Sequence, residues 1–301
     1  MTVVSSKTEG KMKKINRGIN NQAFIDVLNE LRKDENSFWY KMVNDEDLFI
    51  AIRDEYVNVY YSGQSICEFS YLKRKKVVKG KTHEKYLGIE GTGYASSENG
   101  KISSLESVIK DLNELSEIKE NVKKHIEKEK GESYKVILNK ESQVIDTEAT
   151  FVEVLKPNPK KEKGYQRSSI DYVALEKNSE NEIKIVFYEA KHYSNPEIRS
   201  TEVPKVVEQI NRYEEALKLH EKEYKQEIIN TYKLICQNLK DLNIVKNRNL
   251  VEDVNTSNLV IDFQPKLIVF GFGSDAHARE TWEEHKKNIE KGVGKQRLIL
   301  K

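Results

Sequence analysis

The chain of 301 residues has only two cysteines, Cys67 and Cys236, and they lie too far apart to form a metal-binding pair in the sequence. Such sparse usage is typical of reduced thiols in a cytoplasmic protein. No stretch approaches the ~20 consecutive apolar residues that a membrane-spanning helix needs, so we expect no membrane partner. Residues 1–18 lack the apolar centre of a signal peptide, and we expect a flexible basic tail there.

Several familiar catalytic motifs are also missing. The six histidines form no His-Glu-x-x-His zinc motif, and no Gly-x-Ser-x-Gly nucleophile elbow is present. The tripeptide Gly80-Lys81-Thr82 imitates the end of a phosphate-binding P-loop, but Lys75 stands where the first glycine is required. These absences argue against a zinc protease, an α/β-hydrolase and a P-loop nucleotidase.

Charge is abundant but balanced. One third of the residues are charged, yet 51 Lys and Arg against 49 Asp and Glu leave a net charge of only +2. Any surface that binds nucleic acid must therefore be local. The length allows one large domain or two modest ones, each with its own apolar core.

The first third of the chain has the pattern of a small helix and an antiparallel sheet. Apolar residues recur at helical spacing between Asn20 and Lys33. Alternating segments at 48–52, 56–61 and 65–71, separated by turn signals, predict strands of a meander packed on that helix. We expect this domain to cover residues 19–99 and to end in the Gly- and Ser-rich segment 90–99.

A run of cations follows the third predicted strand. We expect it to contact a phosphate backbone, although a solvated edge strand would carry the same residues. The nucleic-acid-binding candidates in this run are Lys73, Arg74, Lys75 and Lys76.

The remaining residues, 100–301, are expected to form the second and larger domain. A capping box at Ser103 and Glu106 predicts a helix that runs to about Lys130 and stops at Gly131. Apolar strand patterns follow at 134–138 and 143–155.

Residues 156–170 are too rich in proline, glycine and charge to be regular structure throughout. Their cations should lie beside the acidic strand that follows, where they could bind phosphates, or else form an ordinary solvent loop. The nucleic-acid-binding candidates here are Lys156, Lys160, Lys161, Lys163 and Arg167.

The most informative stretch is the predicted hairpin of strands 170–175 and 183–192. An antiparallel hairpin places the start of one strand beside the end of the next, so Asp171 should lie close to Glu189 and Lys191. Charged groups at the end of an apolar hairpin are costly to desolvate unless they pair or bind a cation. Because the tripeptide Glu-x-Lys recurs elsewhere in this charged chain, a structural salt bridge would explain the hairpin alone equally well.

The helix predicted after this hairpin begins near Glu202. It carries Gln209 and Tyr213, which are four residues apart and therefore share one face. Beyond it, 265–272 reads as a buried strand, 276–291 as a helix and 296–300 as a terminal strand.

Taken in this order, Asp171, Glu189-Ala190-Lys191 and Gln209-x-x-x-Tyr213 resemble the PD-(D/E)XK nuclease superfamily, in the branch that carries a Gln-x-x-x-Tyr motif. The resemblance covers roughly residues 101–301. It departs from the family pattern at Ile170, which stands at the position of the name-giving proline.

The resemblance implies an α/β fold of the mixed α+β kind, in which a restriction-endonuclease-like mixed central sheet is flanked by helices. It implies Mg²⁺ or Mn²⁺ held by Asp171, Glu189 and a further acidic residue. That residue is Glu148 in our interpretation, with Glu153 and Glu132 as alternatives. Lys191 would assist the attacking water, and Gln209 and Tyr213 would support it.

The function implied is that of a metal-dependent deoxyribonuclease. The choices between endonuclease and exonuclease and between DNA and RNA stay open, as does a homodimer. The alternative from another class is a non-catalytic module on the same fold that binds nucleic acid or a protein partner.

Overall fold

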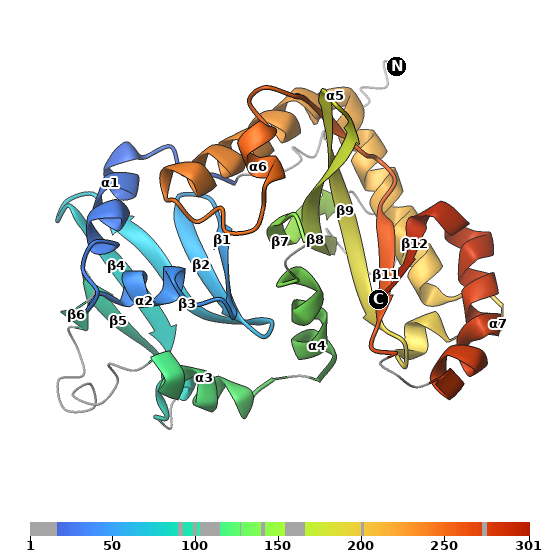
Figure 1. Ribbon diagram of the computed structural model, residues 1–301, viewed down its shortest axis with the longest axis horizontal. Helices are drawn as coiled ribbons and strands as arrows, with labels where there is room; N and C mark the ends of the chain where they lie inside the picture. The colour runs from blue at the N-terminus through green and yellow to red at the C-terminus, as the bar shows by residue number, and fades with distance from the viewer. Residues whose placement is uncertain are drawn as a thin grey trace, which may run out of the picture.

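Figure 1 shows the computed structural model of the chain, in which two β-sheets lie side by side with helices around them. The structure describes residues 17–89, 93–98, 101–102, 115–126, 128–139, 142–153, 166–199, 202–272 and 276–301. Within these residues the strands form two sheets of six strands each. The expected mixed α/β class is confirmed.

The first sheet is an antiparallel meander in sequence order, as the alternating pattern predicted. Its strands are β1 Leu48–Ile52, β2 Tyr56–Tyr61, β3 Gln64–Leu72, β4 Val77–His83, β5 Tyr94–Glu98 and β6 Lys101–Ile102. The helices α1 Gln22–Leu31 and α2 Phe38–Val43 pack on one face through Phe24 and Trp39, both of which are fully buried. The sheet continues through β5 and β6 into the segment where we expected a linker, because β5 pairs with β4.

The second sheet is mixed. Its first three strands are β7 Val144–Glu153, β8 Gln166–Ser179 and β9 Glu182–His192, and β8 runs antiparallel to both of its neighbours. Strands β10 Asn258–Ile261 and β11 Lys266–Phe270 pair with β9 in parallel, and β12 Leu298–Leu300 pairs with β11 in parallel. The strands expected at 143–155, 170–175, 183–192, 265–272 and 296–300 are therefore present, whereas β10 was not predicted.

Helices cover both faces of the second sheet. The long helix α5 Lys205–Asp241 buries Ile210 and Leu217 against the face that carries Val173 and Phe187. On the other face, α4 Lys128–Ile137 packs Tyr134 near Tyr172 and Tyr188. The remaining helical segments are α3 Leu115–Lys123, α6 Leu250–Asp253, α7 Ala276–Val293 and the short 3₁₀ turns η1 Glu84–Leu87, η2 Pro196–Ile198 and η3 Lys295–Arg297.

Two predictions upstream of β7 were wrong. Gly131 does not stop a helix but lies inside α4, and residues 134–137 continue that helix instead of forming a strand. Tyr134 and Leu138 are one helical turn apart, and the Leu138 N–H donates to the Tyr134 carbonyl at 3.0 Å. A short apolar run fits a strand and a buried helix equally well, and packing of Tyr134 on the sheet decided the outcome. The start of the expected helix, 103–114, lies outside the described residues.

A buried ion pair fastens the first sheet to the second. Arg53, at the end of β1, is 2% exposed and pairs with Asp146 of β7, which is 0% exposed. Arg17 approaches the same carboxylate at 3.3 Å. Nearby, the Asn238 side chain of α5 accepts from Ile19 N–H at 2.8 Å and donates to the Ile19 carbonyl at 2.9 Å. Of the expected tail, residues 1–16 lie outside the described part, and Arg17 is anchored.

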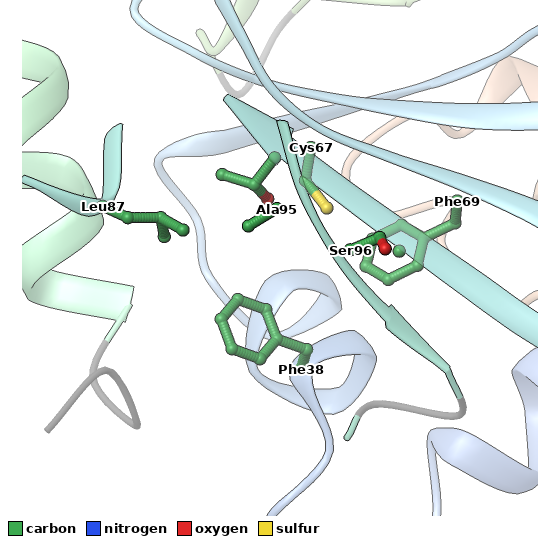
Figure 2. A pocket seen from close by; sticks show the side chains of 8 residues that line it. Phe38, Cys67, Phe69, Leu87, Ala95 and Ser96 are labelled. Atoms are coloured by element: carbon green, nitrogen blue, oxygen red, sulfur yellow. The ribbon is translucent and has the colours of Figure 1, made fainter. Parts of the chain in front are cut away.

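The first sheet holds a small apolar cavity of about 20 Å³ between α2 and strands β3 to β5 (Figure 2). Phe38, Phe69, Leu87 and Cys67 line it. Room for about one water molecule excludes a substrate from this place. Burial raises the pKa of the Cys67 thiol to about 11, and both cysteines are free and buried. None of the described helices is long and apolar enough to cross a membrane.

Candidate active site

The β8–β9 hairpin brings Asp171 and Glu189 together. Tyr172 stands opposite Tyr188 and Val173 opposite Phe187, so the next step of the register places Asp171 at Glu189. The Ala190 N–H donates to Asp171 Oδ2 at 2.8 Å and fixes the carboxylate at this position. Period-two alternation then puts Glu189 on the α5 side of the sheet with Phe187.

Glu189 is buried at the centre of this site, with 2% of its surface exposed. Its Oε1 accepts from Gln209 Nε2 at 2.7 Å and lies 3.0 Å from Lys191 Nζ. Its Oε2 is buried and has no hydrogen-bond partner among the described residues. A buried carboxylate oxygen without a partner is costly, which makes it a natural ligand for a cation.

The two carboxylates disfavour each other's ionisation. Burial, reinforced by the negative charge of Asp171, raises the pKa of Glu189 to about 8. Burial also raises the pKa of Asp171 to about 6, although the Ala190 N–H and Lys191 oppose that rise. A divalent cation between the two groups would remove both penalties, as metal sites commonly do.

Lys191 is held by two carboxylates. Its Nζ lies 3.0 Å from Glu189 Oε1 and 2.8 Å from Glu197 Oε2, and Glu197 belongs to the turn η2. Burial alone would lower the pKa of Lys191, but the charges of Glu189 and Glu197 outweigh it and raise the pKa above its ordinary value. Lys191 therefore carries its proton, as an ammonium, at neutral pH.

Helix α5 completes the cluster with Gln209 and Tyr213. Gln209 Nε2 lies 2.7 Å from the Tyr213 hydroxyl, which in turn donates to the Ser169 carbonyl at 2.9 Å. Tyr213 thus ties the helix to β8, and Gln209 orients Glu189. Burial beside the negative Glu189 raises the pKa of Tyr213, so its hydroxyl stays neutral.

Glu148 lies next to Asp171 but binds other partners. In β7, Thr147 pairs with Tyr172 and Ala149 with Ile170, which leaves Glu148 between them with a left-handed φ of +51°. A non-glycine residue in this conformation inside a strand is strained, and such strain gathers at functional sites.

The Glu148 carboxylate accepts from Lys130 Nζ at 3.1 Å and from the Tyr60 hydroxyl at 2.9 Å. Burial alone would raise the pKa of Glu148, but Lys130, the Tyr60 hydrogen bond and Arg53 hold it below its ordinary value. Glu148 also raises the pKa of Asp171 by its charge. The Glu148 and Asp171 carboxylates therefore interact through their charges, without a hydrogen bond between them in the described structure.

The two alternative acidic residues are placed differently. Glu132 Oε2 lies 3.1 Å from His192 Nε2 and therefore on the face of β9 opposite to Glu189 and Lys191. The side chain of Glu153 lies outside the described residues, although its backbone belongs to β7. The ring of His192 packs against Phe270, with 5.7 Å between the ring centres.

Only some of the residues expected to contact phosphate lie in the described part of the chain. Residues 156–165, with Lys156, Lys160, Lys161 and Lys163, lie outside the described residues, as does the Arg167 side chain. Residues Lys73, Arg74, Lys75 and Lys76 form the exposed turn between β3 and β4 on the first sheet.

Sequence reasoning missed three side chains of the site. Glu197, Lys130 and Tyr60 lie 6, 61 and 131 residues from Lys191 in the chain, and nothing in their local sequence marks them. Only Glu197 was findable in principle, because the Asn195-Pro196 turn that presents it follows β9 directly.

Asp171 and Glu189 supply some, but not all, of the ligands that a hard cation needs. Carboxylate oxygens are the ligands that Mg²⁺ and Mn²⁺ prefer, and Asp171 and Glu189 supply two of them with one oxygen unpartnered. Across the described residues, no three Asp, Glu, His or Cys side chains are arranged as a complete metal site. Water and substrate phosphate usually complete such sites. Comparisons with protein-family models, curated proteins and solved structures yield no match.

Proposed function

We propose that this chain is a metal-dependent nuclease that hydrolyses phosphodiester bonds of DNA on a restriction-endonuclease-like core. The observation that carries the proposal is the cluster of Asp171, Glu189 and Lys191 at the end of an apolar hairpin, with one buried Glu189 oxygen unpartnered. A mixed sheet with a parallel strand β11 beside β9, and α5 over the site, agrees with the topology that the resemblance implies.

Asp171 and Glu189 would hold Mg²⁺ or Mn²⁺, with Glu148 as the third carboxylate. A bound cation of this kind polarises the scissile phosphate and lowers the pKa of a bound water. Glu148 would have to exchange its contact with Lys130 for this role, and the Lys130 ammonium would then be free to bind a phosphate oxygen.

Lys191 acts in this proposal as an ammonium. Its raised pKa makes it a donor that orients the attacking water and stabilises charge on the phosphate as the bond breaks. Gln209 keeps Glu189 Oε1 in place, and Tyr213 keeps Gln209 in place through Ser169. Rigid support of this type holds charged groups where the transition state needs them.

The second candidate is a non-catalytic module that binds nucleic acid or a protein partner. One observation favours it: the Glu148 carboxylate is already bound by Lys130 and Tyr60, and this leaves two carboxylates for a cation. Such a module would bind DNA without cutting it, and Mg²⁺ would not alter the binding.

The test is cleavage of linear duplex, circular duplex and single-stranded DNA, and of RNA, in Mg²⁺, Mn²⁺ or EDTA. Wild type is compared with Lys191→Ala and with Lys177→Ala, an exposed lysine on the same hairpin as the matched control. We expect metal-dependent cutting by wild type and the control, and a loss of at least 100-fold in Lys191→Ala. Equal cutting by all three proteins, or binding without cutting, would overturn the proposal.

A further inference from the structure

The outer face of β4 carries a regular row of basic side chains on the first sheet. Lys79, Lys81 and His83 alternate along the strand with the buried Val78 and Gly80. Because side chains alternate across a strand, the three basic residues share the face that points away from the core of this sheet.

An exposed aromatic ring borders this row. Tyr94 of β5 stands opposite His83 in the register and is 59% exposed, a high value for a large apolar side chain. The His83 ring lies 5.0 Å from it edge-on, and Lys81 Nζ lies 4.3 Å from the centre of the ring. Lys85 Nζ sits over the neighbouring Tyr86 at 4.8 Å.

These side chains surround a surface depression of about 230 Å³. Lys81 and Lys85 form no salt bridge with a carboxylate in the described part of the chain, and both ammonium groups instead contact aromatic rings. Of the residues that line the depression, Glu68 alone is acidic. The basic side chains of the depression suit a polyanion, and the exposed ring of Tyr94 suits a planar group such as a nucleic-acid base.

A second basic feature of this sheet lies at the other end of β4. The exposed turn before β4 holds the cations of 73–76, and residues 77–82 of β4 separate it from His83. At ~3.3 Å per residue this separation is roughly 20 Å, enough for a short run of nucleotides. One end of the run would meet cations, and the other would meet cations and an exposed ring.

We propose that Lys81, His83, Lys85 and Tyr94, together with the turn 73–76, bind single-stranded nucleic acid. This inference rests on the proposed nuclease function and adds that its substrate includes an unpaired strand. A base would stack on Tyr94 in place of the Lys81 ammonium, which would then bind a phosphate. Stacking of this kind needs an unpaired base, because a duplex encloses its base faces.

The experiment measures binding of a fluorescent single-stranded oligonucleotide by anisotropy, in EDTA so that no cleavage occurs. A duplex of the same length and an acidic polypeptide serve as competitors. We compare Tyr94→Ala with Tyr94→Phe, which keeps the ring. We also compare Lys81→Ala with Lys225→Ala, because Lys225 belongs to α5 and likewise lies over an aromatic ring, that of Phe263.

We expect Tyr94→Ala to weaken binding of the single strand by roughly 10- to 100-fold, since a stacked base contributes ~1–3 kcal/mol. Tyr94→Phe and Lys225→Ala should bind as wild type does, and Lys81→Ala should weaken binding and reduce its dependence on salt. Equal binding by Tyr94→Ala and Tyr94→Phe, or stronger competition by the duplex or the acidic polypeptide, would overturn the inference.

The outcomes separate this inference from the proposed function. Lys177→Ala should bind the oligonucleotide normally, because Lys177 lies in β8 on the other sheet. Metal-dependent cutting together with normal binding by Tyr94→Ala would support the proposed nuclease function and reject the proposed single-strand binding surface. Tyr94-dependent binding without any cutting would reject the nuclease and leave the binding surface.

Discussion

Replacement of Glu189 by glutamine should stabilise the protein at alkaline pH and have little effect on stability at acid pH. The folded protein holds the Glu189 proton up to a pKa of about 8, whereas the unfolded chain releases it near 4.5. Because the pKa is raised on folding, the protein is most stable below pH 4.5 with respect to this group. That contribution is lost as the pH rises through 8.

The size of the effect follows from the same values. A rise from 4.5 to about 8, at ~1.4 kcal/mol per pKa unit, gives up to about 5 kcal/mol. Coupling to Asp171 reduces this figure, so we expect Glu189→Gln to be about 2–5 kcal/mol more stable than wild type at pH 8.5. At pH 5 both side chains are neutral in the folded protein, and the two proteins should differ by less than about 1 kcal/mol. Lys191 adds no pH dependence in this window, because its raised pKa leaves it an ammonium in both states.

The assay is urea denaturation of both proteins in EDTA at pH 5 and pH 8.5, so that no cation compensates the carboxylates. Glu180→Gln, an exposed glutamate in the turn of the same hairpin, is the control and should change stability at neither pH. In excess Mg²⁺ the order at pH 8.5 should invert, since only wild type gains stability from binding the ion. An equal stability difference at the two pH values in EDTA would refute the electrostatic reasoning.

Two further predictions concern the frame around the site. Arg53→Ala should destabilise the protein by about 3–5 kcal/mol, because it removes the closest cation from the buried Asp146 and leaves that carboxylate to Arg17 and the Thr147 N–H. Denaturation should show it, and a loss below 1 kcal/mol would mean that the pair does not join the sheets. Gly271→Ala should cost about 2 kcal/mol or more, since a Cβ there would lie 2.3 Å from the His192 ring at a φ of +91°. A melting temperature equal to that of wild type would contradict this.

The parts of the fold that local pattern determines were predictable. Alternation in β8 and β9, broken by a polar turn, predicted the hairpin and the position of Asp171 beside the end of β9. The four-residue spacing of Gln209 and Tyr213 predicted a shared helix face, where they form a hydrogen bond. These features depend on residues that are close in sequence or on one hairpin.

The parts that distant contacts determine were not predictable. Glu148 could not be singled out from Glu132 and Glu153, because its surroundings come from Tyr60 and Lys130 and from a left-handed backbone that nothing in the sequence indicates.

The join between the two sheets was equally hidden. The Arg53–Asp146 pair spans 93 residues, and each residue looks like an ordinary surface charge in a chain that is one third charged. Tyr134 was assigned to a strand because a short apolar run fits a strand within a sheet as well as a helix packed on the face of a sheet.

The most direct test of a cation site at Asp171 and Glu189 is calorimetric titration of the metal-free protein with Mn²⁺ at pH 7, in two buffers of different ionisation enthalpy. We predict binding with release of about one proton, since Glu189 keeps its proton at this pH until the ion displaces it. Asp171→Asn and Glu189→Gln should each abolish the binding. Binding that both variants retain, or the absence of binding by wild type at millimolar Mn²⁺, would contradict the account.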